Sequence, residues 1–256
     1  MTESLMNLWH PIASSEDLPY RHIFQGQLLG RELAVWRADD DFVNVWENRC
    51  LHRGLRLSIG RNDGLELRCQ YHGWRYANRS AGCTYIPAHP ADAPARTICN
   101  RTFPSVERYG LIWSGEEPIG EPPEIAALEN VETLLLRSIA VNAPLKLVLG
   151  HLANYRFSIT GDPDNLATTS LDYQDERSLS LTGTSDGKES TVVFFVQPVD
   201  SNRSVIRGML SSSPSGAERL PTLRHHSTEL SRLRDIVELE ALDGPSLEPM
   251  VATIEQ

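Results

Sequence analysis

The chain of 256 residues has no apolar run of the length that a membrane-spanning helix needs, roughly 18 to 20 residues. It also has no excess of positive charge, because its formal net charge is −10. Nucleic acids and anionic membrane surfaces are themselves negative, so this charge argues against both as partners. We find no internal repeat and no low-complexity segment. The sequence therefore predicts a protein that binds neither nucleic acid nor membrane.

Cysteine is scarce, with four residues in the whole chain. Residues 1–20 contain no basic segment followed by an apolar core, so we expect no secretory signal. Both observations predict a reducing compartment, the cytoplasm, where disulfides are rare. Pairs of cysteines in such a protein become candidate metal ligands.

The first half of the chain is typical of short strands separated by turns. The turn signals are residues 38–41 (ADDD) and Asn62-Asp63-Gly64, the latter between residues 57–59 and 65–68. The expected strands are residues 27–36, 42–47 and 109–113. Residues 116–124 (EEPIGEPPE) are rich in Glu, Pro and Gly, which is typical of a domain boundary. We therefore expect two domains, 1–120 and 121–256.

The second half mixes expected strands and helices. Residues 191–198 and 204–211 are β-rich and are separated by Asp200-Ser201-Asn202, which predicts a hairpin. Residues 221–242 carry apolar side chains at helical spacing, and we expect Pro221 in the first turn and Gly244-Pro245 after the last. We also expect a strand at residues 133–142 and a short helix at residues 145–157.

Two short segments combine cysteine with histidine. Cys50 and His52 are separated by one residue, and sixteen residues further on Cys69 and His72 are separated by two. Each pair places one thiolate and one imidazole on a tight loop. A Rieske centre uses this donor set, with two cysteines on one iron and two histidines on the other. Replacing two thiolates by neutral imidazoles raises the reduction potential of the cluster.

A structural zinc site is the alternative, because it also uses two cysteines and two histidines. Zinc fingers usually pair Cys with Cys and His with His, whereas each loop here mixes the two. Gly54 and Gly73 follow the two pairs, and a glycine allows the backbone to approach a cluster closely. The pattern therefore favours a [2Fe–2S] cluster held by Cys50, His52, Cys69 and His72.

The segments CLHRGLRLSIGR, from Cys50, and LRCQYHGWRY, from Leu67, resemble the Rieske domain of the Rieske non-haem iron oxygenases. Respiratory Rieske proteins differ, since they carry further cysteines where this chain has Leu55 and Tyr71. The likeness continues through residues 83–90 and 106–113 and covers residue 8 to about residue 118. Cys83 and Cys99 match no ligand position, and we expect both to be small apolar fillers.

This resemblance implies an α+β protein: an all-β Rieske domain followed by a reduced α+β domain of the helix-grip, START-like type. It also implies a second metal, a mononuclear Fe(II) bound by two histidines and a carboxylate. The family carries this signature after the domain boundary as an Asp, a His three residues on and a second His five residues further. The corresponding stretch here is residues 144–165.

No register of that stretch supplies the two histidines. One register places Asn154, Phe157 and Asp162 at the ligand positions, and the other places Ala153, Arg156 and Gly161 there. No histidine occurs between His151 and His225. The segment RDIV, from Arg234, resembles the family's late acidic ligand, so Asp235 is a possible residual iron ligand; otherwise it is a solvated helix residue.

A rearranged site that combines His225 and His226 with Asp235 is a further possibility. Adjacent histidines point in different directions on a helix, which opposes it. We therefore doubt that this chain binds a mononuclear iron.

Three functions follow from this interpretation. The first is a Rieske subunit that carries electrons from a reductase or ferredoxin to a mononuclear iron on a partner. That partner would be a histidine-complete catalytic subunit in a hetero-oligomeric ring of the trimer or hexamer kind. The second is a self-sufficient mono- or dioxygenase with an altered iron site, which hydroxylates or demethylates a small aromatic substrate. The third, ranked last, is a binding or assembly protein with a structural cluster.

Overall fold

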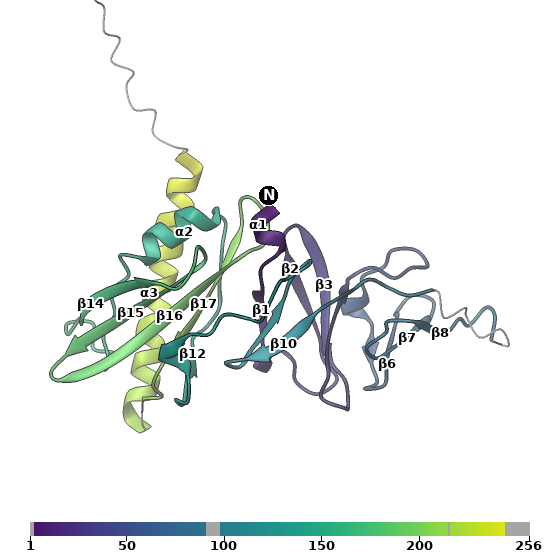
Figure 1. Ribbon diagram of the computed structural model, residues 1–256, viewed down its shortest axis with the longest axis horizontal. Helices are drawn as coiled ribbons and strands as arrows, with labels where there is room; N and C mark the ends of the chain where they lie inside the picture. Colours follow the sequence, from purple (N-terminus) through teal and green to yellow (C-terminus); the bar gives the residue numbers. More distant parts are fainter. Residues whose placement is uncertain (1–2, 91–97, 215, 244–256) are drawn as a thin grey trace, which may run out of the picture. The chain divides into compact units, whose positions relative to one another are not determined.

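The computed structural model describes residues 3–90, 98–214 and 216–243, and these residues form two compact units (Figure 1). Unit 1 comprises the described residues of Met1–Leu135 together with Gln197–Ser201. Unit 2 comprises the described residues of Leu136–Val196 and Asn202–Gln256. The expected domain limits, 1–120 and 121–256, stay a prediction.

Unit 1 consists almost entirely of antiparallel strands. One sheet has the order β2-β3-β4-β9, a second has the order β5-β6-β7-β8, and a third has the order β1-β11-β10. The strands are β1 His10–Ser14, β2 Ile23–Leu28, β3 Arg31–Arg37, β4 Val43–Glu47, β5 Arg61–Asn62, β6 Glu66–Arg68, β7 Arg75–Ala77, β8 Cys83–Tyr85, β9 Thr102–Phe103, β10 Ser105–Arg108, β11 Leu111–Ser114 and β12 Leu134–Leu135. Short helical turns are α1 Glu3–Met6, η1 Ser15–Asp17, η2 Leu57–Ile59 and η3 Ala126–Leu128.

The prediction of one continuous strand at residues 27–36 is wrong, because a hairpin turn interrupts this segment. Leu29 and Gly30 both have positive φ, 49° and 84°. Two consecutive residues of this kind make the type of turn that matches the twist of paired strands. The chain reverses there, and β2 pairs with β3 so that Leu28 faces Arg31.

The core of unit 1 next to the candidate site is aromatic. Trp36, Trp46 and Tyr76 are almost completely buried, and the two tryptophan rings meet edge to face with centroids 5.1 Å apart. Cys50 and Cys69 belong to the same buried cluster. The two cysteine-bearing loops are therefore anchored on a rigid, well-packed base. Cys83 is buried as expected, but Cys99 is exposed, so the expectation that it fills the core is wrong.

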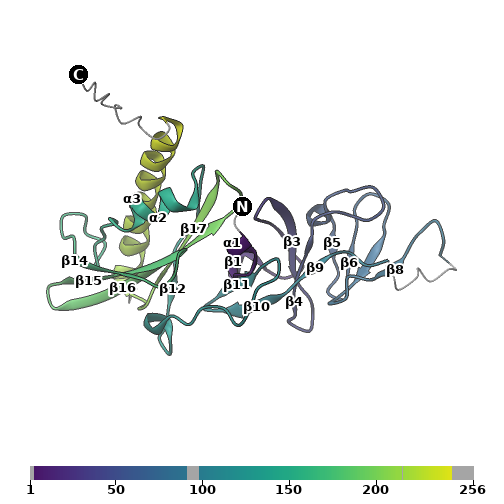
Figure 2. The same cartoon turned by 45° about the horizontal axis from the view of Figure 1, so that its top comes forward.

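Unit 2 contains a sheet in which β17, β16, β15 and β14 follow one another and β13 also pairs with β17. Helices α2 and α3 lie on the same face of this sheet, as Figure 1 and Figure 2 both show. The elements are β13 Ile139–Val141, α2 Leu145–Leu152, β14 Thr168–Tyr173, β15 Ser178–Ser185, β16 Lys188–Pro198, β17 Ser204–Leu210 and α3 Gly216–Asp243. The fold class expected from the resemblance, α+β, is confirmed.

The expected hairpin is confirmed as β16 and β17, while the expected strand at residues 133–142 is two short strands, β12 and β13. The expected long helix begins earlier than predicted, at Gly216, so Pro221 lies inside α3. At this place the proline lies beyond the first turn and removes one backbone hydrogen bond of the helix, the bond to the carbonyl of Ala217. The expected stop at Gly244-Pro245 lies outside the described residues. None of the helices in the described part of the chain has the length and hydrophobicity of a membrane crossing.

Candidate metal centre

The two loops that carry the candidate ligands share one backbone pattern. In the first, the N–H of Cys50 donates to the carbonyl of Leu55 at 2.8 Å, and Gly54 donates back to Cys50 at 2.8 Å. In the second, Cys69 donates to Trp74 at 2.8 Å and Gly73 donates back to Cys69 at 3.2 Å. Each loop thus closes by two hydrogen bonds at identical offsets from its cysteine.

A positive φ at the same place makes both loops possible. Gly54 has φ 68° and Gly73 has φ 71°, a region that residues with a Cβ rarely adopt. The expectation that glycine serves a backbone role here is therefore confirmed. The histidine comes two residues after the cysteine in the first loop and three after it in the second.

The structure places the sulfur atoms inside and the imidazoles outside. Cys50 and Cys69 are 3% and 2% exposed. His52 is exposed and His72 is half-buried, and their ring centroids lie 4.6 Å apart. The histidine end of the site therefore faces solvent, and the cysteine end lies in the core.

Hydrogen-bond donors point to both sulfur atoms. The hydroxyl of Tyr76 lies 3.2 Å from the sulfur of Cys50, and the same oxygen accepts the N–H of Leu51 at 3.2 Å. Burial raises the pKa of the Cys69 thiol, whereas the backbone N–H groups of Tyr71 and His72 act in the opposite direction by donating to its sulfur. These donors favour negative charge on sulfur and so suit thiolate ligands.

Two aromatic side chains flank the imidazoles. Trp74 is half-buried, and its indole is stacked on the ring of His52 at 5.1 Å with an interplanar angle of 4°. Tyr71 lies against His72 with centroids 3.7 Å apart, and its side chain is mainly exposed. The indole therefore orients the His52 ring, while the phenol covers one side of His72.

This donor set fits a [2Fe–2S] cluster. A Rieske cluster takes two cysteines on one iron and two histidines on the other, and the loops present one such pair at depth and one at the surface. When bound, such a cluster accepts and donates one electron at a time. Loops closed by backbone hydrogen bonds hold the four donors ready without help from a disulfide.

The positions that the resemblance assigns to a mononuclear iron lie in unit 2 and do not suit that metal. Asn154, Arg156 and Gly161 line a cavity there, while Phe157 is buried in the core. A guanidinium group opposes a metal cation, and neither glycine nor phenylalanine has a ligating side chain. In the described parts of the chain, no group of three or more His, Cys, Asp or Glu side chains is placed to hold one metal ion.

The other candidates for that iron are occupied elsewhere. Asp235 is exposed and pairs with Arg234 at 2.7 Å. His225 and His226 are buried; His225 accepts the N–H of Ser158 at 3.0 Å, and His226 bonds the Tyr155 hydroxyl at 2.8 Å. The two imidazoles point to different partners, as expected for neighbours on a helix. The assignment of Asp235 as a residual ligand stays a prediction.

The fold of unit 1 and the two loops define an iron–sulfur protein of the Rieske type. Residues 8–107 match the family described as Rieske [2Fe-2S] domain. Oxidoreductase NdmD of Pseudomonas putida is 48% identical over 151 residues, which cover 57% of this chain and 26% of NdmD. Methylxanthine N1-demethylase NdmA of the same organism is 37% identical over 117 residues, which cover 43% of this chain and 32% of NdmA.

Solved structures share the fold over nearly the whole chain. NdmA of Pseudomonas putida CBB5 has a TM-score of 0.75 at 20% identity, with 96% of this chain and 85% of that chain covered. Apo dicamba monooxygenase has a TM-score of 0.72 at 18% identity, with 97% and 92% covered. Residues 8–107 thus match a Rieske [2Fe-2S] domain, and the chain as a whole shares the fold of these solved structures. In sequence it spans about a quarter to a third of the curated relatives, 26% of NdmD and 32% of NdmA.

Proposed function

We propose that this chain is the Rieske electron-transfer component of a non-haem iron oxygenase system. Cys50, His52, Cys69 and His72 are the proposed cluster ligands. One observation carries the proposal: the four cluster donors are complete in unit 1, whereas the positions for a catalytic iron in unit 2 hold residues such as Arg156 that do not bind a cation. The acceptor is then a mononuclear iron on a histidine-complete partner subunit, in a hetero-oligomeric ring.

The electron donor, a reductase or ferredoxin, is expected to be acidic near its own redox centre. Residues 49–79 contain seven arginines and two acidic residues, in a chain whose net charge is −10. Arg53 and Arg68 are exposed and have no ion-pair partner among the described residues. Attraction between these arginines and an acidic surface on the donor would accelerate the encounter of the two electron carriers.

The His52 and His72 rings form the natural contact point for that donor. They lie at the outer end of the site, and the indole of Trp74 is stacked on the His52 ring. The chain's own residues thus orient the imidazoles, keep the sulfurs away from water and surround the exposed edge with positive charge.

Metal and sulfide analysis of the purified chain tests the proposal. We expect two irons and two acid-labile sulfides per chain, reduction by one electron, and no substrate turnover without a partner. Loss of all colour and sulfide in a Cys69→Ala variant is expected as well. A single zinc without sulfide, or a fully assembled cluster that no reductase or ferredoxin can reduce, contradicts the proposal.

A self-sufficient oxygenase is the second candidate, and the observation in its favour is the fold of unit 2. The chain follows NdmA over 96% of its length, which includes the unit that follows the Rieske domain. The same metal analysis separates the two candidates: a third iron per chain, together with turnover of a small aromatic compound by the isolated chain, supports this second candidate.

A further inference from the structure

We propose that strand β14 of unit 2 is a contact between two copies of this chain, which pair antiparallel about a two-fold axis at Leu171. The proposal goes beyond the electron-transfer function and does not depend on the cluster. It rests on the exposure of β14, on its open edge and on the side chains that a second copy presents to it.

Strand β14, Thr168–Tyr173, is exposed on both of its faces. Thr169 is half-buried, and the other five residues are exposed. An antiparallel sheet in a single domain usually packs at least one face on the core. Six consecutive residue pairs with β15 hold β14 in place. The strand therefore still has surface to bury on each side.

The outer edge of β14 is open. The strand comes last in the sheet order, after β15, and it pairs with no further strand in the described part of the chain (Figure 1). An open edge presents unpaired backbone N–H and C=O groups to solvent. Proteins usually protect such an edge with a proline, a lysine or a bulge. Strand β14 has the sequence TTSLDY and a continuous register with β15, so it carries none of these protections.

One face of β14 continues the core side of the sheet. Leu171 lies opposite Leu181 of β15, and Tyr173 lies opposite Leu179. Both leucines of β15 are almost completely buried, whereas Leu171 and Tyr173 are 41% and 57% exposed. The apolar surface of the sheet thus extends one strand beyond the buried core, and burying this extension against a second apolar surface is favourable.

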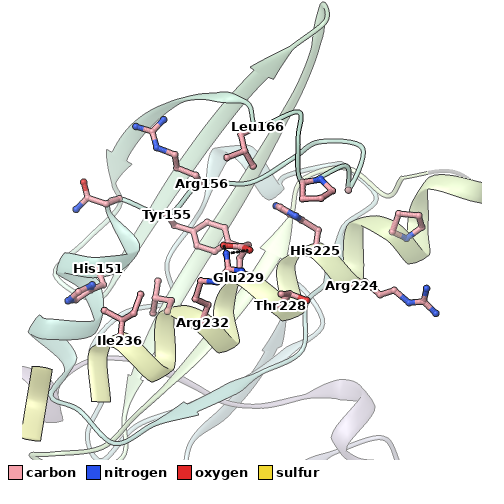
Figure 3. A pocket seen from close by; sticks show the side chains of 15 residues that line it. His151, Tyr155, Arg156, Leu166, Arg224, His225, Thr228, Glu229, Arg232 and Ile236 are labelled. Carbon is pink, nitrogen blue, oxygen red and sulfur yellow. Dashed lines mark hydrogen bonds and ion pairs between the residues drawn. The ribbon is translucent and has the colours of Figure 1, made fainter. Parts of the chain in front are cut away.

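The layer that covers the core side ends before β14. In the sheet, Leu179 of β15 lies opposite Phe194 of β16, and the Phe194 ring meets the ring of Tyr155 edge to face at 5.0 Å. Tyr155 comes from the segment after α2 and lies over the sheet (Figure 3). This cover buries Phe194 and Leu179 but leaves Leu171 and Tyr173 open to solvent.

A second copy of β14 complements the first. In an antiparallel pair, residues directly opposite each other share one face of the sheet. Centring the pair on Leu171 places this residue against its own copy and Thr169 against Tyr173, so the two apolar faces join. On the other face Asp172 lies opposite Ser170 of the second copy. The carboxylate then gains a hydroxyl donor, and no two like charges lie directly opposite each other.

The size of the contact sets its strength. Stable complexes bury about 800 Å² on each partner, and one short strand pair buries less, so we expect a reversible dimer with a micromolar Kd. Sedimentation velocity of the intact holoprotein from about 1 to 200 μM measures this range of Kd. We expect a monomer at the lowest concentration and a dimer at the highest. A monomer throughout, or assembly into trimers only, overturns the proposal.

Charge variants test the position of the contact. L171K places two ammonium groups opposite each other and is expected to weaken the dimer by about tenfold or more, although Leu171 is exposed enough for a single chain to fold with lysine there. The control is L239K, which changes a leucine of α3 that is 63% exposed and is expected to leave the dimer unchanged. An equal loss in L239K, or no loss in L171K, overturns the proposal.

A mixture of L171K and L171E provides the rescue. Each variant alone is expected to stay monomeric, while the equimolar mixture forms a dimer because lysine and glutamate then lie opposite each other. The mixture also shows that both variants are folded. A mixture that stays monomeric at concentrations where the wild type is a dimer overturns the proposal.

Cysteine variants test the register. The two-fold axis brings the Cβ atoms of the two Leu171 residues within the range of a disulfide, whereas the two Ser170 residues lie diagonally across the pair and outside it. Anaerobic oxidation with oxidised glutathione is expected to cross-link L171C about tenfold faster than S170C, on a non-reducing gel. The wild type is the control, because its Cys99 is exposed. Faster cross-linking of S170C, or cross-linking of neither variant, overturns the proposed pairing.

Discussion

The hydroxyl group of Tyr76 lies 3.2 Å from the sulfur of Cys50, and the same oxygen accepts the N–H of Leu51. Since the oxygen already accepts that N–H, its own proton is available to the sulfur. A hydrogen bond to a cluster ligand stabilises the reduced, more negative state.

Tyr76→Phe is therefore expected to lower the reduction potential. A difference of about 1 kcal/mol between the two oxidation states corresponds to roughly 40 mV for one electron, so we expect a fall of several tens of millivolts. Tyr71→Phe, which removes an exposed hydroxyl without a sulfur contact, is the control. Protein-film voltammetry measures both, and equal potentials in wild type and Tyr76→Phe contradict the prediction.

Gly54 and Gly73 occupy equivalent positions in the two loops, so alanine variants of both compare the cost of a Cβ at each place. Alanine at φ 68° in place of Gly54 meets no atom within 4 Å, so the expected cost is the backbone strain alone, about 1 kcal/mol. Alanine at Gly73 also places its Cβ 3.2 Å from Pro87, so Gly73→Ala is expected to cost more. Urea unfolding of both variants measures the difference, and a larger loss in Gly54→Ala refutes this order.

Removing the carboxylate of Asp235 is expected to leave the iron content unchanged. The side chain is 67% exposed, and among the described residues it pairs with Arg234 of the same helix at 2.7 Å. We expect Asp235→Ala to retain two irons per chain and an unfolding free energy within about 0.5 kcal/mol of wild type. An iron analysis that drops by one in this variant, with sulfide unchanged, identifies Asp235 as a ligand and refutes the expectation.

We expect His226 to make the free energy of unfolding fall in acid. Burial lowers its pKa to about 3, with a smaller contribution from His225, whereas an unfolded histidine titrates near 6.5. The depressed folded pKa means that this stability is fully present above about pH 6.5. It decreases by about 1.4 kcal/mol per pH unit as the pH falls toward the folded pKa.

His226→Asn keeps an acceptor for the Tyr155 hydroxyl but does not titrate, so its unfolding free energy is expected to fall less steeply between pH 6.5 and pH 5. Urea titrations at several pH values measure the two slopes. Parallel curves for wild type and variant exclude His226 as the source of the acid sensitivity.

Charge reversal near the histidine edge is expected to slow reduction by an acidic electron donor. Arg53 follows His52, and the guanidinium group of Arg68 lies beside Gly73, where a Cβ would meet it at 3.5 Å. We expect R53E/R68E to reduce the bimolecular rate about tenfold at low salt and the salt dependence to weaken. Stopped-flow reduction by an acidic ferredoxin measures this rate, with R137E as the control. An equal loss of rate in R137E refutes a local effect.

Local chemistry explains which parts of the fold were predictable. The hairpin β16–β17 and helix α3 were expected because their apolar periodicity and turn residues lie close together in sequence. The turn at Leu29-Gly30 was missed because a leucine at positive φ carries no turn signal. Strand β14 was also missed, since most of its side chains are exposed. Its partner β15 was missed although Leu179 and Leu181 alternate with serines.

The proposed cluster ligands were identifiable from spacing, because each thiolate and imidazole pair sits on one short loop. The Tyr76–Cys50 contact was not, since β7 and the first loop meet only after the sheet has formed. The cavity of unit 2 shows the same limit: residues near 156 and near 225 are remote in sequence, and only packing of α3 over the segment after α2 brings them together.

The sequence by itself determined the donor set of the proposed cluster, because the donors and the glycines that shape their loops are consecutive or nearly so. It also determined the absence of two histidines at the expected iron positions. Only the tertiary structure decided which donors face the sulfurs, which imidazole nitrogen of His225 accepts the N–H of Ser158, and which remote segments line the cavity of unit 2. Those properties depend on burial and on contacts between distant segments, which exist only in the folded chain.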